Sequence, residues 1–437
     1  MQEILDLIKQ HIDNKPKQAW RPGVDTVQYA GPWFDHEEYQ AAVSSLLGGW
    51  LALGDDGQRF ETVFPRLYGR EHGVLVNSGS SANLVMMSVL TSRRLYGFPK
   101  GTKVIVPVAG FPTTMNPIFQ VGFEPVFVDM DIATLNMDTR RLEEAVKSSG
   151  ARAMIFAHAL GNPPNMDDIM AVVNKYNLVL LEDCCDALGS TYDGKPLGSF
   201  GEMASCSFYP AHQISMGEGG FVTCRTHEQE VIARSFREWG RGCYCVGRQA
   251  NMLKNGTCKK RFSCWIEGLP EEIYDHKFTY DEIGYNLKPI EMQASIGLVQ
   301  LKKLDRANDL RRRNHKLLQA VFRKYEEYFH VPEATAKSDP SWFGFGLVIK
   351  DGAPFKRTEI VDFLETKKIQ TRPYFAGNTL LQPGYKHLMP TEQALREFPV
   401  ATKLMKDAFF LGVAPVVTEE QIAYIDQCVG EFLKTHI

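Results

Sequence analysis

A single histidine, His212, lies in a run of small and polar residues that could form part of a catalytic site. The run covers residues 207–220 and reads Ser-Phe-Tyr-Pro-Ala-His-Gln-Ile-Ser-Met-Gly-Glu-Gly-Gly. The ordinary pKa of imidazole lies near neutrality, which suits the side chain to proton transfer. No lysine occurs between Lys195 and Lys254, so no lysine side chain near His212 in the sequence could take over a catalytic role. The residues alone leave both a catalytic role and that of an ordinary polar residue open for His212.

A loop of small residues at positions 77–83 precedes an apolar run at positions 84–90. A helix that begins in such a loop presents free backbone amides and the positive end of its dipole, and the two together can bind a phosphate. Serine and glycine also precede many helices for structural reasons alone. The pattern by itself therefore predicts the start of a helix and gives only weak evidence for an anion site.

Acidic residues follow another apolar run, at positions 178–181. Glu182 and Asp183 are expected at the carboxyl end of a strand, where open α/β sheets form ligand sites. A carboxylate in that place can pair with a pyridine nitrogen and keep it protonated. The structural alternative is that Asp183 caps a helix.

The chain has nine cysteines, and four of them could bind a metal cluster. Cys185, Cys243, Cys245 and Cys258 are separated by 57, one and twelve residues. Four thiolates satisfy a [2Fe-2S] cluster, although this spacing matches no common ferredoxin pattern. Tetrahedral zinc suits the same four ligands, and buried cysteines without a metal are a further alternative.

Short apolar runs alternate with segments of helical periodicity through the first two thirds of the chain. Runs at 104–106, 125–128, 153–156 and 178–181, with helices such as 141–146 and 166–173 between them, predict a largely parallel sheet covered on both faces. A long helix is predicted over residues 290–328, followed by a strand at 342–349 and helices at 358–366 and 418–435. Residues 3–12 are predicted to form a helix outside the core.

We therefore predict an α/β fold in three parts. They are an N-terminal arm (residues 1–40), a large mainly parallel sheet domain (41–325) and a smaller α+β domain at the C-terminus (326–437). The net charge of -3 gives no general attraction to nucleic acid or to an anionic membrane. No apolar stretch is long enough to span a membrane, and the acidic start of the chain is unlike a signal peptide. A cytoplasmic location with reduced cysteines is expected.

The motifs described above resemble those of the sugar aminotransferases that work with pyridoxal phosphate, and the resemblance extends over nearly the whole chain. In that family Ser-Phe-His-Ala-x-Lys precedes Glu-Gly-Gly, and the lysine holds the cofactor as a Schiff base. His212 takes the place of this lysine, and an imidazole cannot form that bond. The resemblance therefore implies pyridoxamine 5'-phosphate held noncovalently, His212 as the proton-transfer group, and the aspartate aminotransferase-like fold of type I.

The same resemblance implies roles for further residues. Ser80, Ser81 and Ser207 are expected to contact the cofactor phosphate, and Asp183 to pair with the pyridine nitrogen. Phe111 aligns with an aromatic residue that stacks on the pyridine face. Packing in the hydrophobic core is the competing interpretation for Phe111.

Two other positions bear on specificity and assembly. Asp186 stands where aminotransferases have Gln or His, near the expected 3-hydroxyl edge of the ring, so it could turn the cofactor away from amino transfer. Gly284-Tyr285-Asn286 resembles a motif in which the asparagine reaches the phosphate in the neighbouring subunit. The resemblance thus implies a homodimer with shared active sites, in which Asn286 binds the cofactor of the partner.

Within this family the chain resembles the iron-sulfur hexulose 3-dehydrases, which combine the lysine-to-histidine change with a cysteine set beginning beside the cofactor aspartate. The last gap of that set is shorter than here, so Cys264 is an alternative to Cys258 as the fourth ligand. The implied reaction is dehydration at carbon 3 of a nucleotide-linked 4-keto-6-deoxyhexose in the synthesis of 3,6-dideoxyhexoses for O-antigen. Electrons would come from an NADH-dependent flavin and iron-sulfur reductase through the [2Fe-2S] cluster.

Overall resemblance favours CDP-4-keto-6-deoxyglucose as the substrate, with a TDP sugar as the alternative. A glutamate-using 3-dehydratase or a sugar aminotransferase relative, each without a cluster, is the main alternative for the function. A catalytically idle member of the fold that serves as a metal-binding or assembly subunit is a second alternative.

Overall fold

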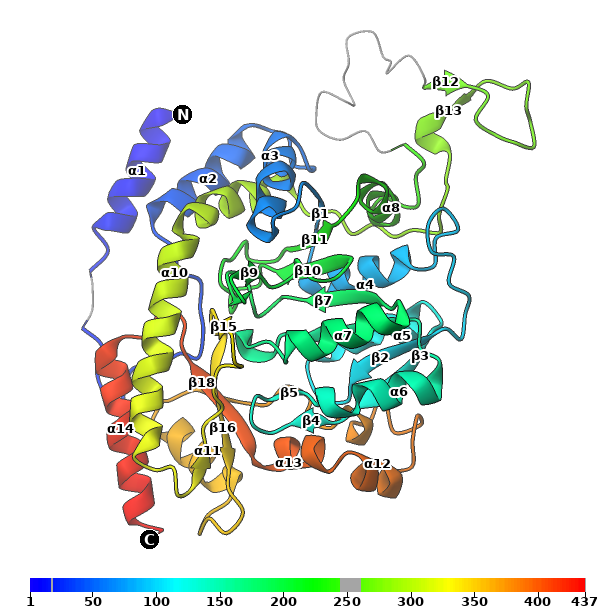
Figure 1. The fold of residues 1–437 in the computed structure, drawn as a ribbon. Helices are drawn as coiled ribbons and strands as arrows, with labels where there is room; N and C mark the ends of the chain where they lie inside the picture. The colour runs from blue at the N-terminus through cyan, green and yellow to red at the C-terminus, as the bar shows by residue number, and fades with distance from the viewer. Residues whose placement is uncertain (17–18, 244–260, 437) are drawn as a thin grey trace.

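A seven-stranded sheet forms the centre of the molecule in the computed structural model, which describes residues 1–16, 19–243 and 261–436 (Figure 1). Its strand order is β1-β11-β10-β7-β6-β2-β3. Within it β11 is antiparallel to both neighbours, and the strands from β10 to β3 are parallel. The bounds are β1 (His72–Val76), β2 (Lys103–Pro107), β3 (Glu124–Val128), β6 (Ala153–Ala157), β7 (Val179–Asp183), β10 (Met203–Ser207) and β11 (Gly220–Cys224). The predicted mainly parallel sheet is confirmed.

Helices cover both faces of this sheet, because its strands bury apolar side chains on both sides. In β1, Val74 and Val76 pack on the helices of one face, and Leu75 packs on those of the other. The first face carries α4 (Gly79–Val89), α5 (Pro112–Gln120) and α8 (His227–Arg237). The second carries α3 (Asp55–Val63), α6 (Leu142–Ser149), α7 (Met166–Tyr176) and the first half of α10 (Glu291–Arg323).

The long helix α10 joins two hydrophobic cores. Ala294 and Leu304 pack under the large sheet, whereas Leu318 and Phe322 pack under a smaller one. The smaller sheet is antiparallel, with the order β14-β16-β18-β17. Its strands are β14 (Phe329–His330), β16 (Gly344–Ile349), β17 (Thr371–Pro373) and β18 (Ala408–Gly412).

The remaining helices lie around these two cores. α11 (Arg357–Thr366) and α14 (Glu419–Lys434) pack on the smaller sheet, and α12 (Thr391–Glu397) and α13 (Pro399–Asp407) fill the space towards the larger one. At the N-terminus α1 (Gln2–Asp13) packs on α2 (His36–Leu47), and α2 packs on α10. Asp35 and Glu38 form a capping box that starts α2. Each helix predicted at the sequence level is present, within a few residues of its expected ends.

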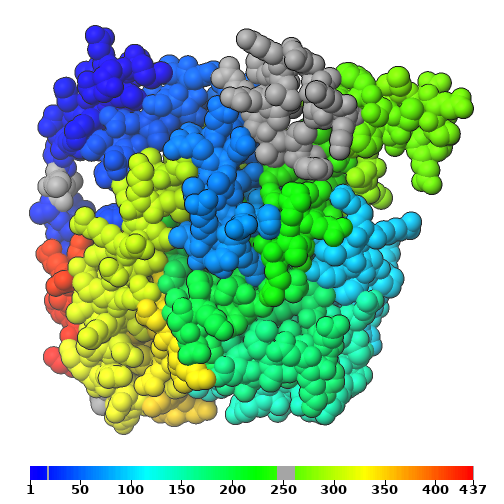
Figure 2. Space-filling model, turned by 45° about the horizontal axis from the view of Figure 1, so that its top comes forward, coloured from blue at the N-terminus to red at the C-terminus, as the bar shows by residue number. Residues whose placement is uncertain are grey.

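Small sheets of two or three short strands complete the described architecture. They are β4 (Met130–Asp131) with β5 (Asn136–Met137), β8 (Thr191–Tyr192) with β9 (Lys195–Pro196) and β15 (Ser338–Asp339), and β12 (Phe262–Ser263) with β13 (Tyr274–Asp275). The β12–β13 pair stands off the body of the molecule (Figures 1 and 2). Among the described helices, none combines the length and the apolar character needed to cross a membrane. The predicted division into parts at residues 40 and 325 stays a prediction.

Candidate active site

A cavity of ≈ 1070 Å³ opens at the carboxyl ends of the parallel strands. The loops after β1, β2, β6, β7 and β10 line one side of it. The other side comes from Phe343, Phe410 and a C-terminal segment that includes Arg372 and Tyr385. His212 and the predicted cofactor-binding residues Ser80, Ser81, Phe111, Asp183, Asp186 and Ser207 all line this one cavity.

The start of α4 forms one end of the cavity. Ser78 caps the helix by accepting a hydrogen bond from the amide of Ser81, whose hydroxyl donates to Asn77 at 2.6 Å. The first amides of a helix have no partner within it and can receive a phosphate. Gly79 is required here, because an added Cβ would lie 2.5 Å from the Cβ of Ser207. The absence of a side chain brings Ser207 up against the helix start.

Asp183 lies at the end of β7, and its carboxylate is held by four donors. The Nδ2 of Asn83 and the hydroxyl of Thr114 donate to Oδ2 at 2.8 and 2.7 Å. The amide of Cys185 and the hydroxyl of Ser205 donate to Oδ1 at 3.0 and 3.3 Å. Asn83 and Thr114 were not predicted as site residues, although Asn83 ends the loop at positions 77–83 and Thr114 lies three residues after Phe111. The helix-cap alternative for Asp183 is wrong, since its oxygens bind side chains of α4 and α5.

His212 lies in the loop that follows β10, and a buried arginine fixes the backbone of that loop. Nη2 of Arg311, on α10, donates to the carbonyl oxygen of His212 at 2.7 Å. Arg311 also donates to the carbonyl oxygens of Ala211, Trp342 and Phe343. Burial lowers the pKa of His212 to about 3, with a smaller contribution from the Arg311 guanidinium. The imidazole is therefore neutral at physiological pH and can accept a proton.

Asp186 is the closest acidic neighbour of His212. Its Oδ1 lies 3.5 Å from Nδ1 of His212, and its Oδ2 accepts a hydrogen bond from the amide of Leu160 at 3.3 Å. Burial raises the pKa of Asp186 to about 8, and the charge of Asp183 adds to the shift. Near neutral pH both groups of the pair are thus uncharged, with the carboxyl group protonated and the imidazole neutral.

Aromatic side chains cover the cavity walls. Phe111 is 56% exposed and lies edge-on to Phe375, with ring centroids 6.3 Å apart. Core packing of Phe111 is therefore wrong, and its ring is available to a planar ligand. Tyr209 also lines the cavity with an exposed ring.

Asn286 is exposed and does not line the cavity of its own chain. It pairs with Glu238 in an isolated antiparallel bridge at the end of α8. The predicted contact of Asn286 with a cofactor in a neighbouring subunit stays a prediction.

The predicted cluster ligands are only partly placed. Cys185 lines the cavity, Cys243 is half-buried after α8, and Cys264 is exposed after β12. Cys245 and Cys258 lie outside the described residues. Within the ranges 19–243 and 261–436, neither Cys185, Cys243 nor Cys264 belongs to a group of three or more metal-ligating side chains. The [2Fe-2S] assignment stays a prediction.

The described features fit a pyridoxal-type cofactor. The helix start at α4 suits a phosphate, the anchored carboxylate of Asp183 suits a pyridine nitrogen, and the exposed Phe111 suits a planar ring. Among the described residues that line the cavity there is no lysine. The cavity thus provides the noncovalent contacts for such a cofactor without the amine that would bind it covalently.

The fold and cavity define a protein of the pyridoxal phosphate-dependent aminotransferase fold. Escherichia coli GDP-4-keto-6-deoxy-D-mannose-3-dehydratase with bound hydrated PLP superimposes with a TM-score of 0.77 at 31% identity, covering 92% of this chain and 98% of that one. The profile of the DegT/DnrJ/EryC1/StrS aminotransferase family matches residues 32–430. The chain belongs to this family.

Two relatives match almost end to end. The lipopolysaccharide biosynthesis protein RfbH of Salmonella typhimurium is 40% identical over 99% of this chain and 97% of its own. The dTDP-4-dehydro-2,6-dideoxy-D-glucose 3-dehydratase of Saccharopolyspora spinosa is 38% identical over 98% of this chain and 91% of its own. The protein is therefore an enzyme of the sugar aminotransferase and 3-dehydratase family, with a cofactor of the pyridoxal phosphate class.

Proposed function

We propose that the protein dehydrates a nucleotide-linked 4-keto-6-deoxyhexose at carbon 3 and that its cofactor is pyridoxamine 5'-phosphate. The observation that carries this proposal is that His212 lines the cavity while the described lining residues include no lysine. An imidazole can move a proton but cannot bind the cofactor covalently as an imine. Amino transfer by a lysine-dependent route therefore lacks its central group. Relatives named as 3-dehydratases support the proposed dehydration at carbon 3.

The residues around the cavity have distinct roles in this proposal. When bound, the cofactor supplies an electron sink for loss of a proton and of a neighbouring hydroxyl group. Asp183 pairs with the pyridine nitrogen, and Phe111 covers one face of the ring. The phosphate is held at the start of α4 by the backbone amides and by the hydroxyls of Ser80, Ser81 and Ser207.

His212 and Asp186 handle the protons. His212, whose imidazole is neutral, takes a proton from the 4' carbon of the cofactor. Hydroxide is a poor leaving group, so a proton must also reach the departing oxygen at carbon 3. His212 relays that proton, and Asp186, 3.5 Å away and protonated near neutral pH, provides a second source. One C–H and one C–O bond break, and water leaves.

The C-terminal side of the cavity is proposed to bind the nucleotide-linked sugar. Arg372 lines the cavity, and its guanidinium lies 4.0 Å from the centre of the Tyr29 ring. A guanidinium in this position can pair with a diphosphate. We propose CDP as the nucleotide; the related 3-dehydratases carry names with dTDP or GDP sugars.

Full deoxygenation at carbon 3 needs two electrons from outside, because elimination of water is redox-neutral. We propose that an NADH-dependent flavin and iron-sulfur reductase supplies them through a [2Fe-2S] cluster on Cys185, Cys243, Cys245 and either Cys258 or Cys264. The position of Cys185, two residues after Asp183 and on the cavity wall, supports this part of the proposal. We also propose that the protein is a homodimer in which Asn286 contacts the cofactor bound by the partner subunit.

A direct test uses the purified full-length protein loaded with pyridoxamine 5'-phosphate. It is incubated in heavy-oxygen water with CDP-, TDP- or GDP-linked 4-keto-6-deoxyhexoses, and mass spectrometry follows exchange of the oxygen at carbon 3. Exchange with one of these sugars, without an amino donor, is expected. Formation of an amino sugar with glutamate would overturn the proposal. Release of a 3-deoxy sugar with glutamate and no reductase would instead establish the glutamate-using dehydratase.

A further inference from the structure

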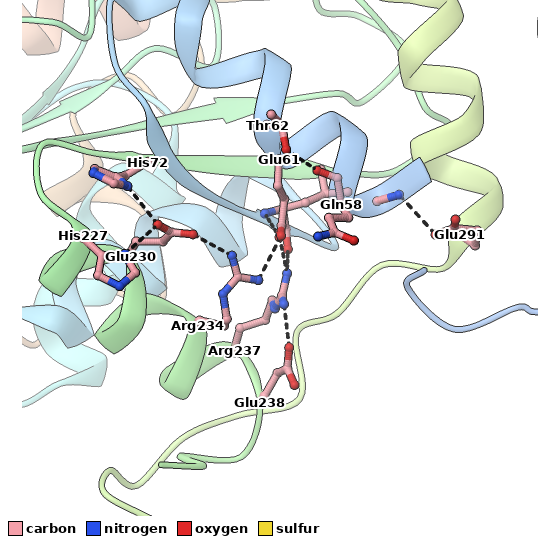
Figure 3. Close-up of polar contacts among 12 residues, drawn as sticks. Gln58, Glu61, Thr62, His72, His227, Glu230, Arg234, Arg237, Glu238 and Glu291 are labelled. Carbon is pink, nitrogen blue, oxygen red and sulfur yellow. Dashed lines mark hydrogen bonds and ion pairs between the residues drawn. The ribbon is translucent and has the colours of Figure 1, made fainter. Parts of the chain in front are cut away.

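Two histidines and a glutamate meet at the amino end of β1 (Figure 3). The active-site cavity lies at the other end of this strand, where residues 77–81 line it. His72 is the first residue of β1, and His227 and Glu230 lie three residues apart in the first turns of α8. The Nδ1 of His72 is 3.0 Å from Oε2 of Glu230, and the Nδ1 of His227 is 3.4 Å from the same oxygen. The three ligand atoms lie within 4.8 Å of one another.

Two of the three separations, those from each imidazole nitrogen to the shared carboxylate oxygen, match the spacing of ligand atoms around a tetrahedral metal ion. With metal-ligand bonds of about 2.0–2.1 Å, neighbouring ligand atoms of a tetrahedral ion lie roughly 3.3 Å apart. The two nitrogen-to-oxygen distances, 3.0 and 3.4 Å, lie on either side of that value. One carboxylate oxygen is shared by two imidazole nitrogens, so a cation can replace both hydrogen bonds by coordination with little movement of the side chains.

The carboxylate of Glu230 is held in place from its other side. Its Oε1 accepts a hydrogen bond from Nη2 of Arg234 at 2.8 Å, and Arg234 is fixed by Glu61 at 2.9 Å. Such outer contacts orient the ligands of metal sites. The chain of ion pairs continues through Arg237 to Glu238 (Figure 3), so three carboxylates face two guanidiniums.

The site is also open to solvent on one side. The side chain of His227 is 63% exposed, that of His72 is 30% exposed and that of Glu230 is 19% exposed. Two imidazoles and one carboxylate are a ligand set that zinc accepts readily, with water as the usual fourth ligand.

We propose that His72, His227 and Glu230 form a binding site for a divalent transition-metal ion of the zinc class. The ion ties the edge strand β1 to the start of α8. Because β1 leads directly into the loop at residues 77–81, the site braces the strand that carries the phosphate-binding end of the cavity. It lies outside the set of residues used in the proposed reaction, so it can be tested without turnover.

The test measures zinc bound by the full-length protein after equilibrium dialysis against Zn²⁺, with the metal quantified by mass spectrometry. Wild type is compared with the His72→Gln and His227→Gln variants. The half-buried His36, which makes a 3.1 Å pair with Asp13 and belongs to no such group among the described residues, supplies the matched control His36→Gln. Any zinc on cysteines is present in all four proteins and cancels in the comparison.

The wild type and His36→Gln should hold one more equivalent of zinc than His72→Gln and His227→Gln. Cobalt in place of zinc should give visible absorption typical of nitrogen and oxygen ligands, lost in the same two variants. Equal zinc content in all four proteins would overturn the proposal, as would loss of zinc in His36→Gln. Because the side chain of His227 is mostly exposed, a folding defect cannot account for a loss in His227→Gln, and thermal unfolding without metal verifies this.

Discussion

The Nδ1 of His212 lies 3.5 Å from Oδ1 of Asp186 at the wall of the active-site cavity. Burial acts on the two groups in opposite senses, since it disfavours the charged form of each. It lowers the pKa of His212 to about 3 and raises the pKa of Asp186 to about 8. The pair is therefore uncharged near neutral pH, with the proton held by the carboxyl group of Asp186.

Replacement of His212 by asparagine tests the acid-base role. His212→Asn should lower dehydration by about a hundredfold to ten-thousandfold, the usual effect of losing a positioned acid-base group. Exchange of the oxygen at carbon 3 with solvent gives the rate, and a titration with pyridoxamine 5'-phosphate should show unchanged binding. Borohydride treatment with pyridoxal phosphate should leave residue 212 unlabelled in the wild type. Near-normal exchange in His212→Asn would remove this residue from the mechanism.

The raised pKa of Asp186 predicts a dependence of stability on pH. The folded carboxyl titrates near 8 and the unfolded one near the ordinary value of 3.8, so the folded state binds this proton more tightly. The stabilisation from this group is complete below pH 3.8 and is lost as the pH rises towards 8. Asp186→Asn has no such titration. The unfolding free energy of Asp186→Asn minus that of the wild type should therefore rise between pH 3.8 and pH 8. The slope should be at most about 1.4 kcal/mol per pH unit.

Urea unfolding of the cofactor-free proteins measures this difference. Asp309, whose side chain is 79% exposed, provides the control Asp309→Asn, for which the difference from wild type should not change across the same window. A pH-independent difference for Asp186→Asn would show that the Asp186 carboxyl is not protonated in the folded protein.

Removal of the charge at Asp183 should weaken cofactor binding. A hydrogen bond to a charged group contributes about 1.5–3 kcal/mol, so Asp183→Asn should raise the dissociation constant of pyridoxamine 5'-phosphate roughly ten- to a hundredfold. Thr114→Val removes one of the donors to Asp183 and should have a smaller effect of the same sign. Absorbance titrations measure both constants. An unchanged constant in Asp183→Asn would exclude pairing with the pyridine nitrogen.

Mixed dimers test the shared active site. A subunit with Asn286→Ala lacks the predicted contact to its partner's cofactor, and a subunit with His212→Asn lacks the proton-transfer group. Each homodimer should be weakly active, whereas the mixed dimer should regain one working site. If mixed dimers form, as shown by two different affinity tags, and no activity returns, Asn286 does not act across the interface.

The cysteine set should serve reduction and not dehydration. Cys245→Ser should abolish electron uptake from the reductase and formation of the dideoxy sugar, while cofactor binding and oxygen exchange at carbon 3 persist. Comparison of Cys258→Ser with Cys264→Ser identifies the fourth ligand. Cys428→Ala is the control, because it removes a cysteine that lies in the core under the smaller sheet and is not a predicted cluster ligand. Full dideoxy-sugar production in Cys245→Ser, or zinc in place of iron, would end the electron-transfer role.

The sequence by itself determined the features that depend on local pattern. The apolar runs predicted β2, β3, β6 and β7, because the strands of a parallel sheet that is covered on both faces carry mostly apolar side chains. The loop at residues 77–83 predicted the start of α4, since small residues with a capping serine are local requirements of a helix N-terminus. Motif resemblance then pointed to His212, Asp183 and Asp186.

Only the tertiary structure decided which groups surround these residues. Asn83 lies 100 positions before Asp183, and Arg311 lies 99 positions after His212, yet each makes a direct hydrogen bond. The opposite shifts in the pKa values of His212 and Asp186 likewise come from burial between segments far apart in the chain. His72 meets Glu230 for the same reason, since β1 is paired with β11 in the sheet and α8 follows β11 directly. The local sequence pattern carries no information about these contacts. Their distances and their burial from water are set by the packing of elements that lie far apart in the chain.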